Sequence, residues 1–246
     1  GQIVTIAGPH GTFHQYLPTT LTDSPDLVVL VHGTPGKDET AAEVARYYLE
    51  NWVDTAEEHG VILLAPAFDE ADFSSKHGDQ ALGGYRGLFG RHIGADEFVL
   101  EIVDAYQETF GSADGKFYLY GHSAGGQYTS RFIVKHPQRI KGAVITAAGT
   151  YAHPNPDIAW PYGLGELHTT YQWPDSNIEQ TVDFKPNPDD WLAAATLPVT
   201  VIVGLNDLEW QPDRTAQKGN NRVTIARNWV KDMNDFAARH GLTGTI

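Results

Sequence analysis

Short apolar runs alternate with stretches of helical periodicity along most of the chain. The runs are continuous rather than alternating, as in strands that are buried on both faces of a sheet. They cover residues 27–31, 61–65, 117–120, 142–146 and 199–203. Because helical segments separate them, the sequence predicts an α/β protein with a mostly parallel central sheet and helices on both faces.

Four segments between and after these runs have the composition or spacing of amphipathic helices. They are 39–59, which stops at Gly60; 94–110, which stops at Gly111; 126–136, which stops before Pro137; and 223–237, which precedes Gly241. Residues 242–246 look like the beginning of a further strand, so we expect the last strand of the sheet to be cut short.

Two stretches do not follow this alternation of apolar runs and helical segments. Residues 66–93 are rich in glycine and charge and too long for an ordinary strand-to-helix loop. Their arginines, Arg86 and Arg91, are expected to anchor the loop through salt bridges, with a reach into the active-site cleft as the alternative. Residues 149–190 hold many prolines and aromatic residues without a clear period. We therefore predict one domain, residues 1–246, with a lid-like insertion at about 150–190.

Composition excludes several functions. Lys and Arg number 17 against 31 Asp and Glu, and the net charge of −14 argues against nucleic acid and anionic membrane surfaces as partners. The chain has no cysteine, which rules out disulfides, thiolate metal sites and a cysteine nucleophile. No apolar run approaches the roughly 18 residues of a membrane span, so we expect a soluble protein. A start at Gly1 is compatible with a removed leader, which slightly favours a secreted or periplasmic location.

The clearest chemical signal is Gly121-His122-Ser123-Ala124-Gly125-Gly126, between an apolar run and a helical segment. A serine on a sharp strand-to-helix turn needs glycines two residues to either side, because the backbone is crowded there. Such a nucleophile elbow pushes the hydroxyl of Ser123 out above the sheet. The plainer alternative is a glycine-rich turn that serves packing alone.

A serine nucleophile also needs a base for its proton and donors for the oxyanion that forms. We expect the backbone N–H of Ala124 to be one donor of this oxyanion hole. The other should be the N–H of Thr34 in the loop His32-Gly33-Thr34-Pro35-Gly36, since Pro35 has no N–H. A tight turn without a catalytic role is the alternative for this loop.

These motifs, together with Gly204-Leu205-Asn206-Asp207 after the last apolar run, resemble the α/β-hydrolase superfamily over about residues 26–246. The long loop and the insertion are most similar to serine esterases of the polyhydroxybutyrate depolymerase and feruloyl esterase type. The resemblance implies an acid in the loop that holds Asp207, with Glu209 as the nearest competitor. Asp207 would orient the base histidine of the catalytic triad and stabilise its imidazolium form. A turn-capping role is the alternative.

The base histidine is where this chain departs from the family pattern. The family carries it after a further strand, whereas His240 is the only histidine that follows Asp207. His240 also continues the stripe of the last helix, where a histidine commonly caps the C-terminus. The base is therefore His240, or it comes from a C-terminal fragment or partner chain that supplies the missing strand and histidine. We expect His122 and His32 to be structural.

The sequence calls for no cofactor and no metal. His10 and His14 are four residues apart, but they lie among Gly, Pro and Thr residues without a helical period. Substrate contacts are assigned to Trp160, Trp173 and Trp210, which could line an apolar cleft, although these aromatic residues could equally form the core of the insertion.

These residues together predict a serine esterase in which Ser123 attacks a small-molecule or polymeric ester and forms an acyl-enzyme. Two alternatives stay open. The same arrangement cleaves amides, as in a serine peptidase or amidase. A chain without the triad histidine would instead be an incomplete, hydrolase-like binding protein, because losing that histidine costs on the order of 10⁶ in kcat.

Overall fold

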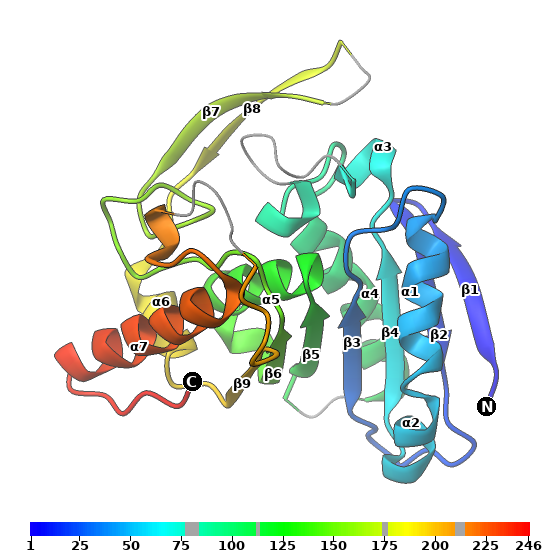
Figure 1. The fold of residues 1–246 in the computed structure, drawn as a ribbon. Coiled ribbons are helices and arrows are strands. Elements are labelled where there is room, and N and C mark those ends of the chain that lie inside the picture. Colours follow the sequence, from blue (N-terminus) through cyan, green and yellow to red (C-terminus); the bar gives the residue numbers. More distant parts are fainter. Residues whose placement is uncertain (77–83, 112–113, 174–176, 210–214) are drawn as a thin grey trace.

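The computed structural model describes residues 1–76, 84–111, 114–173, 177–209 and 215–246 (Figure 1). Seven strands form one sheet in the order β1-β2-β4-β3-β5-β6-β9. The apolar runs predicted five of these strands, and each of the five is parallel to its neighbours within that group. These are β3 (Leu27–Val31), β4 (Ile62–Ala67), β5 (Phe117–His122), β6 (Ile140–Thr146) and β9 (Val199–Ile202). The predicted mostly parallel α/β architecture is confirmed.

An N-terminal hairpin extends this sheet at one edge. It consists of β1 (Ile3–Gly8) and β2 (Gly11–Tyr16), which pair antiparallel, and β2 pairs antiparallel with β4. The sequence predicts no strands here. Both strands mix exposed or half-buried positions with buried ones, so they lack the continuous apolar runs that mark strands buried on both faces.

The two faces of the sheet carry different helices. Leu27 and Val29 of β3 join the core beneath α4 (Ala95–Phe110), α5 (Ala124–Lys135) and α7 (Arg222–Arg239). Val28 and Leu30 point the other way and pack under α1 (Ala41–Glu50) and α2 (Val53–His59). The single helix expected over 39–59 is therefore two helices, with a break at 51–52.

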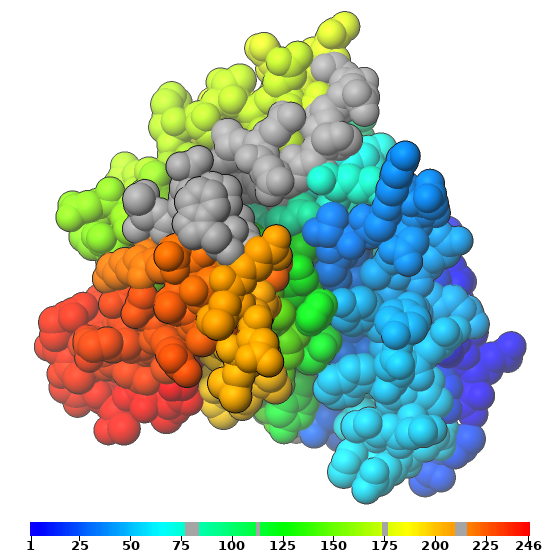
Figure 2. All heavy atoms as spheres, in the orientation of Figure 1, coloured from blue at the N-terminus to red at the C-terminus, as the bar shows by residue number. Residues whose placement is uncertain are grey.

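The face that carries α1 and α2 is covered unevenly. These helices pack over β2, β4 and β3, whereas an open groove of about 440 Å³ runs along the β5, β6 and β9 side. This apolar groove is lined by Trp52, Tyr118, Tyr120, Val144 and Thr200, among others. In Figure 2 the green surface of this region is visible between the blue and cyan helices and the orange segment around β9. Part of a sheet face thus remains open to solvent.

The chain leaves the sheet after β6 and returns to it at β9. Between them, a hairpin of β7 (Leu167–Gln172) and β8 (Glu179–Phe184) projects from the top of the molecule in Figure 1. Its inner side packs through Tyr171 and Trp173 against Phe89. The shorter elements are α3 (Glu70–Phe73), α6 (Pro188–Ala194), η1 (Gly84–Gly87), η2 (Pro137–Arg139) and η3 (Thr215–Gln217).

The end of the chain lies close to the start of β9 (Figure 1). The N–H of Thr245 donates to the carbonyl of Ala195 at 3.0 Å. Residues 242–246 do not form the strand expected there. Among the helices of the described residues, none is both long enough and apolar enough to cross a membrane.

Candidate active site

Ser123 occupies the sharp turn between β5 and α5. Its backbone has φ 53° and ψ −110°, in the region that residues other than glycine rarely adopt. The N–H of Ser123 donates to the carbonyl of Thr146 at 2.8 Å, and its carbonyl accepts from the N–H of Gln127 at 3.0 Å. The strained turn is therefore held by both β6 and α5, as a nucleophile elbow requires.

The glycines around this serine are required by close backbone contacts. A Cβ on Gly121 would lie 2.1 Å from the carbonyl oxygen of Gly125, and one on Gly125 would lie 2.1 Å from that of Val31. A Cβ on Gly33 would lie 3.6 Å from the Cβ of Ser123. The loop of Gly33 and Thr34 therefore lies beside the serine, where an oxyanion donor would have to be.

The two N–H groups expected to hold the oxyanion are available. Neither the N–H of Thr34 nor that of Ala124 donates to another residue within the described ranges. Ala124 is the first residue of α5, where a helix leaves N–H groups unsatisfied and its dipole favours negative charge. The Oγ1 of Thr34 accepts a hydrogen bond from Nη2 of Arg86 at 2.7 Å. This side of Ser123 can stabilise an anion.

Asp207 lies beyond the carboxyl end of β9, and Ser123 lies beyond the carboxyl end of β5, so both are at the carboxyl ends of the parallel strands. Its carboxylate is bound by Nη1 of Arg222, at 3.1 Å to Oδ1 and 3.3 Å to Oδ2. Arg222 is the first residue of α7, and sequence reasoning gave it no role. Burial, and then the positive charge of Arg222, lower the pKa of His122, which adjoins Ser123. Asp207 is thus close to the elbow, but it pairs with an arginine rather than the expected histidine.

His240 takes the capping role rather than that of a base. It follows the last residue of α7, its Nδ1 lies 2.8 Å from the carbonyl oxygen of Phe236, and the two rings are 4.7 Å apart. In the described part of the chain His240 forms no hydrogen bond with Ser123 or Asp207. The structure thus does not bring His240 together with Ser123 or Asp207, and Nδ1 of its ring is used at the end of its own helix.

The histidines nearest the elbow are also engaged elsewhere. Nδ1 of His122 lies 3.0 Å from Oγ1 of Thr146. His32 is fully buried, with Nε2 accepting from the N–H of Phe68 at 3.1 Å and Nδ1 donating to the carbonyl of Gly33 at 2.6 Å. Burial lowers the pKa of His32 to about 4, so this ring is neutral near pH 7. No described histidine hydrogen-bonds the hydroxyl of Ser123.

The histidines near the N-terminus have structural contacts as well. His14 bonds Oγ1 of Thr5 at 2.9 Å and the carbonyl of Ala42 at 2.7 Å, and His10 lies 3.8 Å from Glu101. Among the residues placed by the structure, no group of three or more His, Asp or Glu side chains is arranged to hold a metal ion.

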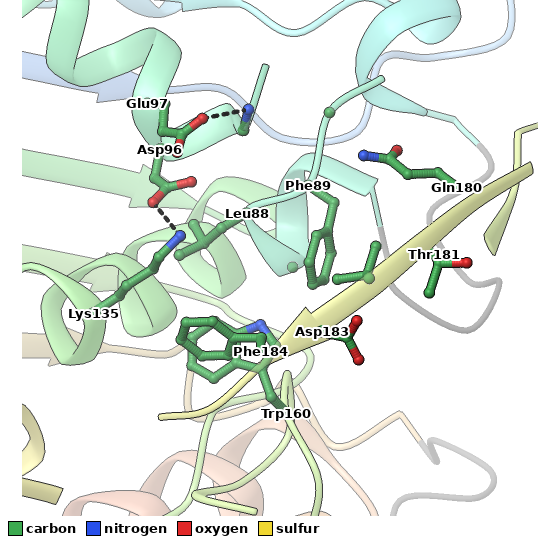
Figure 3. Close-up of a pocket in the computed structure, with 14 residues that line it drawn as sticks. Leu88, Phe89, Asp96, Glu97, Lys135, Trp160, Gln180, Thr181, Asp183 and Phe184 are labelled. Atoms are coloured by element: carbon green, nitrogen blue, oxygen red, sulfur yellow. Dashed lines mark hydrogen bonds and ion pairs between the residues drawn. The ribbon is translucent and has the colours of Figure 1, made fainter. Parts of the chain in front are cut away.

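The structure places two of the three tryptophans assigned to substrate contacts. Trp160 packs against Phe184, with ring centroids 4.8 Å apart, and lines a cavity of about 250 Å³ between β8, the start of α4 and the end of α5 (Figure 3). Lys135 in the same cavity is the last residue of α5, about 18 Å along that helix from Ser123. Trp173 is buried, and its Nε1 donates to Gln180 at 2.9 Å. Both pack the insertion, and Trp210 lies outside the described residues.

Comparisons with known proteins agree with this architecture. A family model described as alpha/beta hydrolase fold matches residues 26–177. No curated protein matches the sequence. Poly(aspartic acid) hydrolase-1 from Sphingomonas sp. KT-1 is similar in structure, with a TM-score of 0.72 at 23% identity over 99% of this chain and 88% of that one. LpqC, a poly(3-hydroxybutyrate) depolymerase from Bordetella parapertussis, has a TM-score of 0.71 at 20% identity over 95% of this chain and 74% of that one. At these identities the likeness concerns the fold.

Proposed function

The chain belongs to the α/β-hydrolase family, and from this premise we propose that it is a serine hydrolase that cleaves carboxylic esters through Ser123. The observation that supports the proposal best is the backbone of Ser123, held at φ 53° on a turn beside the Gly33–Thr34 loop. Strain of this kind persists where a side chain must be presented for function. The surrounding N–H groups supply the electrostatics that an ester carbonyl needs.

In the proposed reaction, Oγ of Ser123 attacks the ester carbonyl carbon while its proton passes to a histidine base. The N–H groups of Thr34 and Ala124 stabilise the carbonyl oxygen as it becomes negative. When the tetrahedral intermediate collapses, the alcohol leaves with the proton from the base and the acyl group stays on Ser123. Water then attacks the acyl-enzyme in the same way, and the carboxylic acid is released.

The proposed base comes from a polypeptide segment outside residues 1–246 that docks at β9. This strand is the last of the sheet, and Ile202 on it is 52% exposed. A strand added parallel to β9 would end at the same edge of the sheet as β5, so the residues after it would lie beside Asp207. The same segment would cover the apolar groove, because parallel sheets are normally covered on both faces.

Amide hydrolysis is the second candidate activity. It is favoured by the structural likeness to poly(aspartic acid) hydrolase-1, whose named substrate is a polyamide. The same nucleophile and oxyanion donors serve either bond, so turnover of a p-nitrophenyl ester against the matching p-nitroanilide would separate the two. The third candidate is a hydrolase-like binding protein, favoured by the lack of a described histidine contact to Ser123.

Labelling with a fluorophosphonate probe, followed by intact mass, tests both parts of the proposal. We expect one label on the protein isolated from its native host, none on its Ser123→Ala variant, and an unchanged label on the Ser24→Ala control. Residues 1–246 alone should react much more slowly if the base comes from the docked segment. Equally fast labelling of that chain would refute the docked base and keep the hydrolase. No labelling of either form would refute the hydrolase.

A further inference from the structure

Among the residues that the structure places, Arg86 is a buried cation without a carboxylate partner. Arg86 is part of η1 and is 6% exposed. Nη2 donates to the carbonyl of Ser75 at 2.8 Å and to Oγ1 of Thr34 at 2.7 Å, and Nη1 lies 3.5 Å from the carbonyl of Ser74. All three acceptors are neutral. The arginine ion pairs among the described residues are those of Arg46, Arg139 and Arg222. Within the described ranges, Arg86 therefore does not form the salt bridge expected of this loop.

The two aromatic rings next to this guanidinium do not balance its charge. Tyr85 lies under it, 5.1 Å from the ring centroid, and burial raises the pKa of this phenol, which stays neutral. His32 is neutral as well, because burial lowers its pKa to about 4. Buried charges are nearly always paired with an opposite charge, so a site of this kind is suited to an anion that binds to it.

Thr34 connects this charge to the surface of the active site. The residue is exposed, and because Oγ1 accepts from Arg86, the hydroxyl proton of Thr34 is left to donate. No acceptor for that proton lies among the residues that the structure places. The groups next to Ser123 are therefore donors throughout: the N–H of Ala124, the N–H and O–H of Thr34, and the guanidinium. Such a set of donors selects an anion.

The rim around this loop carries charges of both signs. Nζ of Lys76 donates to the carbonyl of Lys37 at 3.1 Å, three residues beyond Thr34. Glu39 accepts from the N–H of Gly36 at 2.7 Å and Glu70 accepts from the N–H of Lys76, and both carboxylates keep their negative charge in these bonds. The preference for an anion therefore depends on the donors next to Ser123 and not on the rim.

We propose that the substrate of the Ser123 site carries a carboxylate close to the bond that is cleaved, and that Thr34 and Arg86 bind it. This inference rests on the proposed hydrolase function and names its substrate class. The Thr34 N–H remains with the oxyanion, while the Thr34 hydroxyl and the guanidinium take the carboxylate. Half-esters of dicarboxylic acids, or a polymer with a carboxylate in each repeating unit, have this chemistry.

Binding of two matched esters to the Ser123→Ala variant tests the inference without turnover. By calorimetry, monomethyl succinate, which carries one carboxylate, should bind at least tenfold more tightly than neutral methyl butyrate. Adding Arg86→Gln should bring the two affinities together, whereas Arg46→Gln, which removes an exposed arginine that pairs with Glu50, should leave the preference intact. Equal affinities before the arginine is changed, or a preference that survives Arg86→Gln, would overturn the inference.

A second measurement needs no change at Arg86 and guards against a variant that fails to fold. In ¹⁵N spectra of the Ser123→Ala protein, monomethyl succinate should shift the Thr34 N–H and the Arg86 side-chain N–H, and shifts elsewhere alone would refute the site. Succinate preference with no ester or amide turnover in the native protein would refute the hydrolase and leave the anion site standing. Equal turnover of anionic and neutral esters would refute the anion site and leave the hydrolase standing.

Discussion

Replacing Gly125 with alanine would force α5 away from the sheet. The new Cβ would lie 2.1 Å from the carbonyl oxygen of Val31, about 1.3 Å inside ordinary van der Waals contact at 3.4 Å, and 2.8 Å from the carbonyl of His32. These are backbone atoms at the end of β3, which is paired with a strand on each side and cannot yield. Overpacking of this kind costs about 1–3 kcal/mol and sometimes more, against a gain of up to about 1 kcal/mol in helix propensity. Because the clash is with fixed backbone, the cost should lie at the upper end of this range, and we expect a net loss of about 2 kcal/mol.

Urea unfolding followed by tryptophan fluorescence measures this loss, with an unchanged dependence on urea showing that two-state unfolding is retained. Gly204→Ala is the matched control, since nothing lies within 4 Å of its added Cβ, and its stability should stay within about 0.5 kcal/mol of the parent. Any Gly125→Ala protein that folds should also react slowly with a fluorophosphonate, because α5 carries the Ala124 N–H. If Gly125→Ala unfolds within about 0.5 kcal/mol of the parent, the close-contact argument for the elbow is wrong.

Two further predictions concern histidines. His240→Ala should leave the fluorophosphonate labelling of Ser123 within about twofold and lower stability by about 0.5–1 kcal/mol, since its contact with Phe236 caps a helix; a loss of labelling beyond tenfold would restore His240 as the base. The second prediction is a pH dependence of stability: the pKa of His32 is about 4 in the fold and near 6.5 in the unfolded chain, so the unfolded state takes up the proton first. Stability should be complete above pH 6.5 and fall toward pH 4 by up to about 3 kcal/mol from this group. Urea unfolding at pH 7 and pH 4.5 measures the slope, which should decrease in His32→Gln and persist in His240→Ala.

The sequence correctly predicted the strands whose residues form continuous apolar runs. The five apolar runs became the parallel strands, because a strand covered on both faces needs apolar side chains at every position. The edge hairpin of β1 and β2 and the projecting hairpin of β7 and β8 escaped prediction. Their positions alternate or mix exposure, so they lack the continuous apolar run that marks a strand covered on both faces.

The candidate site divides in the same way. The position of Ser123 followed from local sterics, since glycines two residues away allow one sharp turn and little else. The pairing of Asp207 with Arg222 could not be predicted, because it joins a loop to the start of a helix 15 residues later. The burial of Trp160 and Trp173 in the insertion was an open alternative, and packing around the hairpin decided it.

By itself, the sequence determined the five parallel strands and the main helices between them, the elbow at Ser123 and the loop that faces it, because backbone sterics and periodic burial act over a few residues. The tertiary structure alone decided which charges meet. It placed the buried guanidinium of Arg86 against Thr34, 52 residues away along the chain, and it left β9 and the neighbouring sheet face open. Such contacts depend on where distant segments lie once the core has packed, and the spacing of residues along the chain does not determine those positions.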